Sequence, residues 1–265
     1  MEPIYVIKIG GDIIDNDSRL SKFLSDFASV KEKKILVHGG GKMATKLAEQ
    51  LGLAQKMQEG RRITDAETLK IVTMVYAGYI NKNIVARLQA NNCDAIGLCG
   101  ADGNLVLAHK RQHPNIDYGF AGDVDSVRTS FLKTLLENKF TVVIAPITHN
   151  QKGQLLNTNA DTMAQEIAKA LGKEFDVTLI FTFEKRGVLL DITDDNSVIH
   201  ELDPANYRKL KENHRIFEGM IPKLDNAFQA LNHNIQKVII GNAEELQSLI
   251  KGDAGTTIRI NSRNT

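Results

Sequence analysis

The sequence predicts an α/β fold in which helices cover a mainly parallel central sheet. Short apolar runs rich in β-branched residues alternate along the 265-residue chain with segments of helical periodicity. The apolar runs are nearly continuous, as in strands that are buried on both faces of a sheet. Glycine-rich turns follow several of these runs, and open α/β sheets bind their ligands where the parallel strands end. We therefore expect a ligand crevice along one edge of the sheet.

The expected elements follow one another in a regular alternation. Seven strands are predicted at residues 4–9, 34–38, 94–99, 141–146, 177–183, 237–241 and 256–260. Helices are predicted between them at residues 18–30, 42–51, 65–92, 128–138, 160–171, 204–213, 219–233 and 243–250. A helix ends at Leu171 and Gly172, so we expect an N-terminal lobe of residues 1–172 and a C-terminal lobe of residues 173–265.

Two segments outside these strands have the pattern of β-hairpins. Residues 100–110 contain the turn pair Asp102-Gly103, and residues 148–157 contain Lys152-Gly153. Hairpins inserted into an α/β body commonly form the rim or lid of a site.

The longest predicted helix, at residues 65–92, carries an apolar stripe on one face. The stripe recurs at steps of three and four residues. It consists of Leu69, Val72, Tyr76, Ile80, Ile84 and Leu88. Such a stripe packs either into the core of the chain or against a second copy of the chain, and the core is the simpler expectation.

The composition argues against several classes of protein. A net charge of +1, without a dense block of Lys and Arg, argues against nucleic acid as a partner. No apolar run approaches the roughly 20 residues that span a bilayer, and the N-terminus lacks the pattern of a signal peptide, so we expect a cytoplasmic protein. Cys93 and Cys99 have no CxxC spacing and no plausible His pairing, and are expected to be reduced thiols in the core.

Three glycine turns follow predicted strands. They are formed by Gly10-Gly11, by Gly39-Gly40-Gly41 and by Gly187. Glycine lets backbone N–H groups approach an anion closely, and the N-terminus of a following helix adds a favourable dipole. One such turn is common in any tight loop, but several at strand ends indicate a crevice that binds phosphate or carboxylate groups.

Two nucleotide-binding motifs can be compared with the second glycine turn. The Walker pattern GxxxxGK[ST] fails, because Leu36 and Met43 occupy two of its required positions. Residues 39–44 do satisfy the dinucleotide pattern GxGxxA between a strand and a helix. The acidic residue that this pattern requires about 20 positions later would be Glu59, which does not end a predicted buried strand. Dinucleotide binding is therefore a minor alternative.

Two lysines favour a phosphotransferase over a simple binding protein. Lys8 lies within an apolar strand directly before the first glycine turn, where an unpaired charge is costly. It either pairs with a carboxylate such as Asp12, extends to water or contacts a ligand. Lys223 begins a helix after a glycine turn, and alone it would be interpreted as a surface residue. Phosphoryl transfer needs positive charge on the transferring oxygens, which two opposed lysines would supply.

Polar residues between positions 157 and 161 and near position 62 complete the candidate site. The second predicted hairpin ends, and a helix begins, in a segment that contains Asn157, Asn159 and Asp161. An N-cap needs only one polar side chain, and this segment has three. A carboxylate here could orient both lysines or hold Mg²⁺. Arg62 is a candidate bidentate clamp for a carboxylate, with Arg61 as its competitor. The seven histidines show no metal-ligand spacing, and we expect no protein-bound metal.

Seven short motifs occur in an order that is typical of one family. They are KIGG at 8–11, VHGGG at 37–41, GRRIT at 60–64, GADG at 100–103, GQLLNTNAD at 153–161, GMIPK at 219–223 and GTTI at 255–258. From residue 4 to about 260 the chain resembles the acetylglutamate kinases of the amino acid kinase family. The resemblance implies an open αβα sandwich whose N-terminal lobe binds the acylated amino acid and whose C-terminal lobe binds ATP. The implied reaction phosphorylates the γ-carboxylate of N-acetyl-L-glutamate in arginine biosynthesis, with Mg²⁺ carried by the nucleotide.

The resemblance also implies roles for the residues that match its motifs. Lys8 and Lys223 would stabilise the transferring phosphoryl group, and Asp161 would orient both lysines. The N-acyl-glutamate would be bound by Gly40, Gly41, Arg62 and Asn157, with the last two at its α-carboxylate end. The nucleotide would be bound by Gly10, Gly11, Glu184, Gly187 and Gly219.

Departures from the family pattern leave alternatives open. Residues 183–187 read FEKRG where the family usually has [ST]-D-V-x-G, so Glu184 and Lys185 replace an Asp and a Val. GRRIT replaces the usual G-L-R-[IV]-T, and the extra charge of Arg61 leaves N-succinyl-glutamate or another acylated acidic amino acid as an alternative substrate. A non-catalytic nucleotide or amino-acid sensor is a further alternative. No helix precedes the first strand, so the resemblance implies a homodimer, joined through residues 65–92, that arginine does not inhibit.

Overall fold

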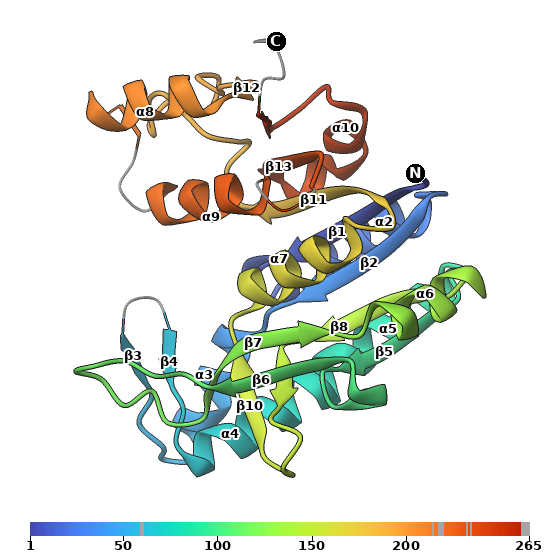
Figure 1. The fold of residues 1–265 in the computed structure, drawn as a ribbon, viewed down its shortest axis with the longest axis vertical. Coiled ribbons are helices and arrows are strands. Elements are labelled where there is room, and N and C mark those ends of the chain that lie inside the picture. Colours follow the sequence, from blue (N-terminus) through green and yellow to red (C-terminus); the bar gives the residue numbers. More distant parts are fainter. Residues whose placement is uncertain (59–60, 214, 217–219, 232, 234, 261–265) are drawn as a thin grey trace.

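The computed structural model describes residues 1–58, 61–213, 215–216, 220–231, 233 and 235–260, and this described part is built around an eight-stranded sheet (Figure 1). In spatial order its strands are β12 (Glu201–Leu202), β14 (Thr256–Ile258), β13 (Lys237–Asn242), β11 (Asp176–Phe183), β1 (Pro3–Ile9), β2 (Lys33–His38), β8 (Thr141–Ala145) and β5 (Ala95–Cys99). Within the described residues, neighbouring strands pair in parallel except β13 and β14. All seven predicted strands lie in this sheet, which confirms the α/β fold.

Helices cover both faces of the sheet. One face packs against α6 (Thr129–Glu137), α7 (Ala160–Leu171), α8 (Pro204–Glu212) and α9 (Ile221–Leu231). The other packs against α1 (Gly11–Ile14), α2 (Asp17–Ala28), α3 (Gly41–Gln50), a long helix at residues 66–90, η4 (Ala243–Glu245) and α10 (Leu246–Lys251). These layers form the predicted open αβα sandwich. Among its described elements, only the short helix α1 and the weak strand β12 were not expected.

The side-chain alternation of β1 separates two apolar cores. Ile4 and Val6 belong to the core under α7 and α9, whereas Ile7 and Ile9 belong to the core under α2 and the long helix. Successive side chains of a strand point to opposite faces, so a strand buried on both faces is apolar at nearly every position. The same alternation turns the side chain of Lys8 toward α7.

The long helix consists of α4 (Ala66–Thr73), the π-helical segment η1 (Met74–Ile80) and α5 (Asn81–Ala90), which run on without a break. All six residues of its apolar stripe are buried in the core of the chain, which confirms the expectation that the stripe packs into the core. Met74 and Tyr79 lie outside the stripe and are 57% and 61% exposed, so any contact with a second copy would use this other side.

One of the two predicted hairpins forms, and the other prediction is wrong. Residues 148–157 do form one, since β9 (Ile147–His149) pairs antiparallel with β10 (Leu155–Thr158). Residues 100–110 do not, because the turn η2 (Asp102–Asn104) leads into β6 (Val106–Lys110), which pairs with β7 (Ala121–Val127). The polar sequence AGDVDSV of β7 carries no apolar alternation by which it could have been predicted.

Strands β6, β7, β9 and β10 close into a small barrel at the end of the molecule opposite α8 and α10 (Figure 1). Beside it lies a two-stranded ribbon, β3 (Lys56–Gln58) with β4 (Arg61–Ile63), which the sequence did not predict. No helix of the described residues is long and apolar enough to cross a membrane. Cys93 and Cys99 are both free thiols, and Cys93 is buried.

Candidate active site

The carboxyl ends of β1 and β2 bring the first two glycine turns together. The strands are parallel neighbours with Ile9 opposite His38, and the Gly39 N–H donates to the Ile9 carbonyl over 3.1 Å. Two clefts open along this edge of the sheet, with volumes of about 380 and 230 Å³. Lys8 and Gly11 line both of them. The Lys8 side chain therefore marks the junction of two adjoining spaces.

Lys8 is held at this junction by an ion pair with Asp161. Only 9% of Lys8 is exposed, and its side-chain nitrogen lies 2.8 Å from Oδ1 of Asp161 in the first turn of α7. Asp161 can make this contact because Asn159 caps the helix, with its Oδ1 accepting from two backbone N–H groups. The alternative pairing of Lys8 with Asp12 is wrong, because Asp12 pairs with Lys42.

Lys223, near the start of α9, lies in the same cleft as Lys8 and Asp161. Its side-chain nitrogen is 3.7 Å from the centroid of the Phe183 ring, a close cation–π contact. Burial is the main cause that lowers the pKa of Lys223; the negative charge of Asp161 raises it and the positive charge of Lys8 lowers it. The fold thus brings together three charged groups that are far apart in the sequence, and two of them act on the pKa of the third, Lys223.

The smaller cleft contains the predicted clamp, Arg62. Its guanidinium is buried and donates to the Gly41 carbonyl over 3.0 Å and to Thr45 Oγ1 over 2.8 Å, and it also bonds to the Gln55 side chain. These contacts hold a positive charge beside the second glycine turn. Thr45 and Gln55 are positioning residues that the sequence did not reveal, because their segments lie in a helix and a loop with no distinctive motif.

Asn157 and Arg61 line the smaller cleft with Arg62. The Asn157 side-chain amide donates to Thr64 Oγ1 over 3.0 Å, which fixes its orientation. Burial lowers the pKa of Arg61, and the charge of Arg111 lowers it further. Both members of the GRRIT pair therefore contribute to the cleft, and the sequence could not decide between them.

The second glycine turn is fixed by close packing and by a neutral histidine. Gly40 has a φ of 153°, and a Cβ atom there would lie 2.3 Å from Cδ1 of Ile80. His38 is fully buried; its Nδ1 bonds to the Gly39 carbonyl over 2.8 Å and its Nε2 to the Asn81 amide over 3.2 Å. Burial lowers the pKa of His38 to about 4, so the imidazole stays neutral. His38 is structural, as expected.

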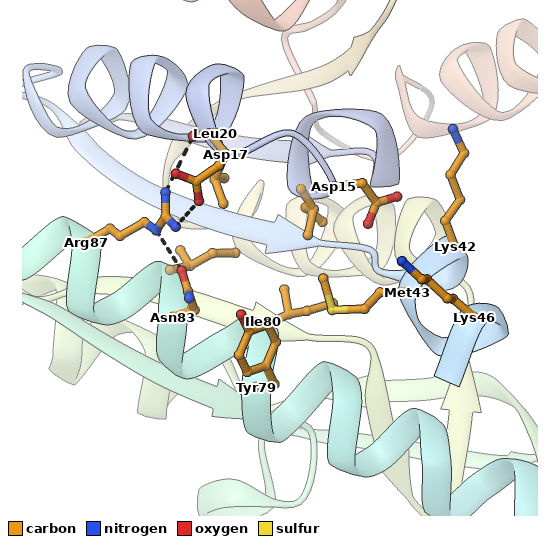
Figure 2. Close-up of a pocket in the computed structure, with 12 residues that line it drawn as sticks. Asp15, Asp17, Leu20, Lys42, Met43, Lys46, Tyr79, Ile80, Asn83 and Arg87 are labelled. Atoms are coloured by element: carbon orange, nitrogen blue, oxygen red, sulfur yellow. Dashed lines mark hydrogen bonds and ion pairs between the residues drawn. The ribbon is translucent and has the colours of Figure 1, made fainter. Parts of the chain in front are cut away.

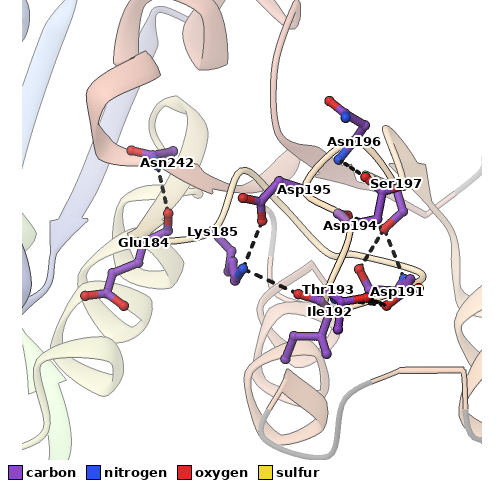
Figure 3. A network of polar contacts seen from close by, with 10 residues as sticks. All are labelled: Glu184, Lys185, Asp191, Ile192, Thr193, Asp194, Asp195, Asn196, Ser197 and Asn242. Atoms are coloured by element: carbon purple, nitrogen blue, oxygen red, sulfur yellow. Dashed lines mark hydrogen bonds and ion pairs between the residues drawn. The ribbon is translucent and has the colours of Figure 1, made fainter.

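The larger cleft extends past the end of β11. Gly10, Glu184 and Gly187, three of the residues predicted to contact a nucleotide, line this cleft. The Glu184 carbonyl accepts from the Asn242 amide over 2.8 Å (Figure 3). Gly219 lies outside the described residues, as does Glu59, which the dinucleotide alternative requires. The sequence did not single out the apolar wall of this cleft, formed by Val188, Leu189, Ile192, Ile216 and Met220.

The larger cleft fits a nucleotide by its chemistry. Two lysines and glycine N–H groups lie at one end for phosphates, and the apolar wall lies at the other for a base. In the described residues no group of three or more His, Cys, Asp or Glu side chains forms a metal site. Asp161 is the acidic group of the cleft nearest the lysines, and its oxygen is already committed to Lys8.

A third cavity, of about 460 Å³, lies between α1, α2, α3 and α5 (Figure 2). None of the predicted catalytic or binding residues lines it. Arg87 at one end is bonded to Asp17 and Asn83, and Lys42 at the other end is paired with Asp12. Its charges are therefore largely matched within the chain, and it is separate from the two clefts.

Comparison with known proteins identifies the family of the chain. Residues 3–242 match the model of the amino acid kinase family. An acetylglutamate kinase of Cytophaga hutchinsonii is 57% identical over 251 residues, which are 94% of this chain and 95% of the relative. The structure resembles N-acetylglutamate synthase from Neisseria gonorrhoeae (TM-score 0.83, 20% identity, 98% of this chain and 60% of that one) and Giardia carbamate kinase (TM-score 0.71, 13% identity, 98% and 99%). The chain therefore belongs to the amino acid kinase family.

Proposed function

We propose that this chain is an N-acetyl-L-glutamate kinase, which transfers the γ-phosphoryl group of ATP to the γ-carboxylate of its substrate and forms an acyl phosphate and ADP. The observation that carries the proposal is the position of the Lys8–Asp161 ion pair, 2.8 Å long, at the junction of the two clefts. The relatives support it, because the acetylglutamate kinase of Cytophaga hutchinsonii aligns with nearly the whole chain.

In the proposed reaction a γ-carboxylate oxygen forms a bond to the γ-phosphorus while the bond from that phosphorus to the β,γ-bridging oxygen breaks. No proton has to be removed from the attacking carboxylate, so catalysis requires alignment and positive charge rather than a base. Lys8 and Lys223 supply that charge from one cleft, and Asp161 orients them. Mg²⁺ arrives on the nucleotide and shields its phosphate charges.

The remaining residues divide between the two ligands. In the N-terminal lobe, residues 1–172, Gly40, Gly41, Arg62 and Asn157 bind the acylated amino acid in the smaller cleft. Gly10 and Gly11, in the larger cleft, offer N–H groups to the phosphates. The C-terminal lobe, residues 173–265, completes the nucleotide site with Glu184, Gly187 and Gly219.

The test is ATP-dependent formation of a hydroxylamine-trappable acyl phosphate from a panel of N-acetyl-, N-succinyl- and free glutamate. We expect the highest kcat/KM with N-acetyl-glutamate. A preference for N-succinyl-glutamate would correct the acyl group and keep the reaction, with Arg61 in the smaller cleft as the residue to examine. Tight ATP binding without turnover on any acidic substrate would instead identify a sensor.

We further propose that the enzyme is a cytoplasmic homodimer of arginine biosynthesis, joined through the exposed side of the long helix. Met74 and Tyr79 are large exposed residues on that side, so they are available for contact with a second copy. Light scattering should give twice the mass of the chain. Tyr79→Glu should reduce it to the mass of one chain, whereas Tyr5→Glu would be uninformative because Tyr5 packs against the core.

A further inference from the structure

We infer that Lys185 is a positioning residue that fastens the loop of residues 190–197 over the base end of the nucleotide cleft. The inference rests on the proposed function, because it assigns the occupant of that cleft as a nucleoside triphosphate.

Lys185 reaches across from the end of β11 to the loop. Its side-chain nitrogen lies 2.9 Å from Oδ1 of Asp195 and donates to the Ile192 carbonyl over 3.4 Å (Figure 3). One lysine therefore binds two points of the loop, one by charge and one by a hydrogen bond to the backbone.

The loop itself is internally bonded. At its base the Leu190 N–H donates to the Ser197 carbonyl over 3.0 Å. Farther out, Ser197 Oγ donates to the Asp191 and Asp194 carbonyls, and Oδ1 of Asp191 accepts from Thr193. Because these bonds hold the loop together, a tether near its tip can set where the whole loop lies.

The loop turns an apolar side chain to the cleft. Ile192, which is 45% exposed, lines the larger cleft next to Leu189, the residue just before the loop. Exposed aliphatic side chains at a cleft wall suit the flat apolar face of a nucleotide base. The phosphate-binding groups, Lys8 and Lys223, are held by other contacts, with Asp161 and with the Phe183 ring.

A rival explanation is that Lys185, which also lines the cleft, binds the nucleotide phosphates directly. The two explanations make opposite predictions for its partner. If Lys185 is a tether, Asp195→Asn releases the loop and weakens ATP binding. If Lys185 is a phosphate ligand, Asp195→Asn removes a competing anion and strengthens ATP binding.

The experiment measures the Kd of MgATP by titration calorimetry, together with kcat at saturating ATP. Lys185→Met and Asp195→Asn should each raise the Kd about two- to fivefold, the range expected for an exposed ion pair, with kcat unchanged. The double variant should bind as weakly as Lys185→Met alone, because Asp195→Asn removes one of the two contacts that Lys185→Met already removes. Lys185→Arg, which keeps the charge, should restore most of the affinity.

Lys133→Met is the matched control. Lys133, on α6, forms a similarly exposed ion pair with Glu174, 3.0 Å long, and its loss should leave the Kd unchanged. Inorganic tripolyphosphate, which has no base, serves as the second probe and should bind equally to wild type and Lys185→Met. Tighter ATP binding by Asp195→Asn, or loss of tripolyphosphate affinity in Lys185→Met, would overturn the inference. Failure of the proposed function would show differently, as absent turnover or absent ATP binding in the wild type.

Discussion

The side-chain nitrogen of Lys8 lies 2.8 Å from Oδ1 of Asp161, joining the central strand of the sheet to the first turn of α7. The two residues are 153 positions apart in the sequence, and the pair stands where two clefts meet. An ion pair in so enclosed a place gives little net stability, because desolvation offsets much of the attraction. Its position is better explained by chemistry on a negatively charged group.

Lys8→Met should lower kcat with N-acetyl-glutamate at least about 100-fold, because one charge on the transferring phosphoryl group is lost. The measurement is the hydroxamate assay at saturating substrates, with circular dichroism to confirm folding. Lys33→Met is the control, since Lys33 lies at the other end of the neighbouring strand and pairs with Glu2. Activity of Lys8→Met within about twofold of wild type would contradict the mechanism.

Asp161→Asn should shift the alkaline limb of the kcat–pH profile to lower pH. The charge of Asp161 raises the pKa of Lys223, so its removal lowers that pKa and Lys223 loses its proton at a lower pH. The profile should be measured between about pH 7 and 11, a range that includes the ordinary lysine pKa. An unshifted limb would show that the ionisation of Lys223 does not control the rate.

Arg62→Met should raise KM for N-acetyl-glutamate roughly 10- to 100-fold and leave KM for ATP unchanged, as for loss of a charge-assisted hydrogen bond to a carboxylate. Steady-state kinetics with each substrate varied in turn gives both constants. Arg61→Leu removes the neighbouring charge of the same cleft and is the matched comparison. A larger increase in KM for N-acetyl-glutamate in Arg61→Leu than in Arg62→Met would assign the carboxylate clamp to Arg61.

Gly40→Ala should destabilise the fold by about 1–3 kcal/mol, because an added Cβ would strain the backbone at φ 153° and collide with Ile80. Chemical denaturation gives the change in the free energy of unfolding. Gly78→Ala is the comparison, since nothing lies within 4 Å of its Cβ position, and it should be neutral or stabilising. Equal effects of the two variants would refute the packing explanation.

His38 should make the fold sensitive to acid. Its pKa is about 4 in the folded chain and ordinarily 6.5, so the unfolded chain binds the proton first as the pH falls. Neutral His38 makes its full contribution to the free energy of unfolding above pH 6.5. About 3 kcal/mol of that free energy should be lost as the pH falls from 6.5 to 4. Chemical denaturation at pH 7 and at pH 5 gives the free energy of unfolding at each pH. The difference between the two values should be smaller for His38→Asn than for wild type. An identical difference in both proteins would exclude His38 as the cause.

The local sequence was sufficient to predict most of the fold. Continuous apolar runs and helical periodicity gave every strand of the central sheet except β12, and the ends of the longer helices to within a few residues. These signals are local, because burial on two faces or on one stripe leaves a period in the sequence. β7 was missed because its sequence is polar and has no regular apolar period. Its pairing with β6 is a contact between separate segments, which leaves no local signal in the sequence.

The candidate site was predicted in part. Glycine turns and a lysine in an apolar strand are local anomalies, so Lys8, Gly10, Gly11, Gly40 and Gly41 could be found without a structure. Thr45, Gln55 and Asn81, which hold Arg62 and His38 in place, are ordinary residues in their own segments. Their role arises only from contacts across the fold.

The sequence by itself determined that strands end in anion-binding turns and that Lys8 must find a partner, because a charge in a buried strand is costly alone. Only the tertiary structure decided that the partner is Asp161 and not Asp12. The reason is geometric: strand alternation points Lys8 to the face covered by α7, whereas Asp12 lies in α1 and pairs with Lys42. Residues far apart in sequence meet only where the packing of sheet and helix places them.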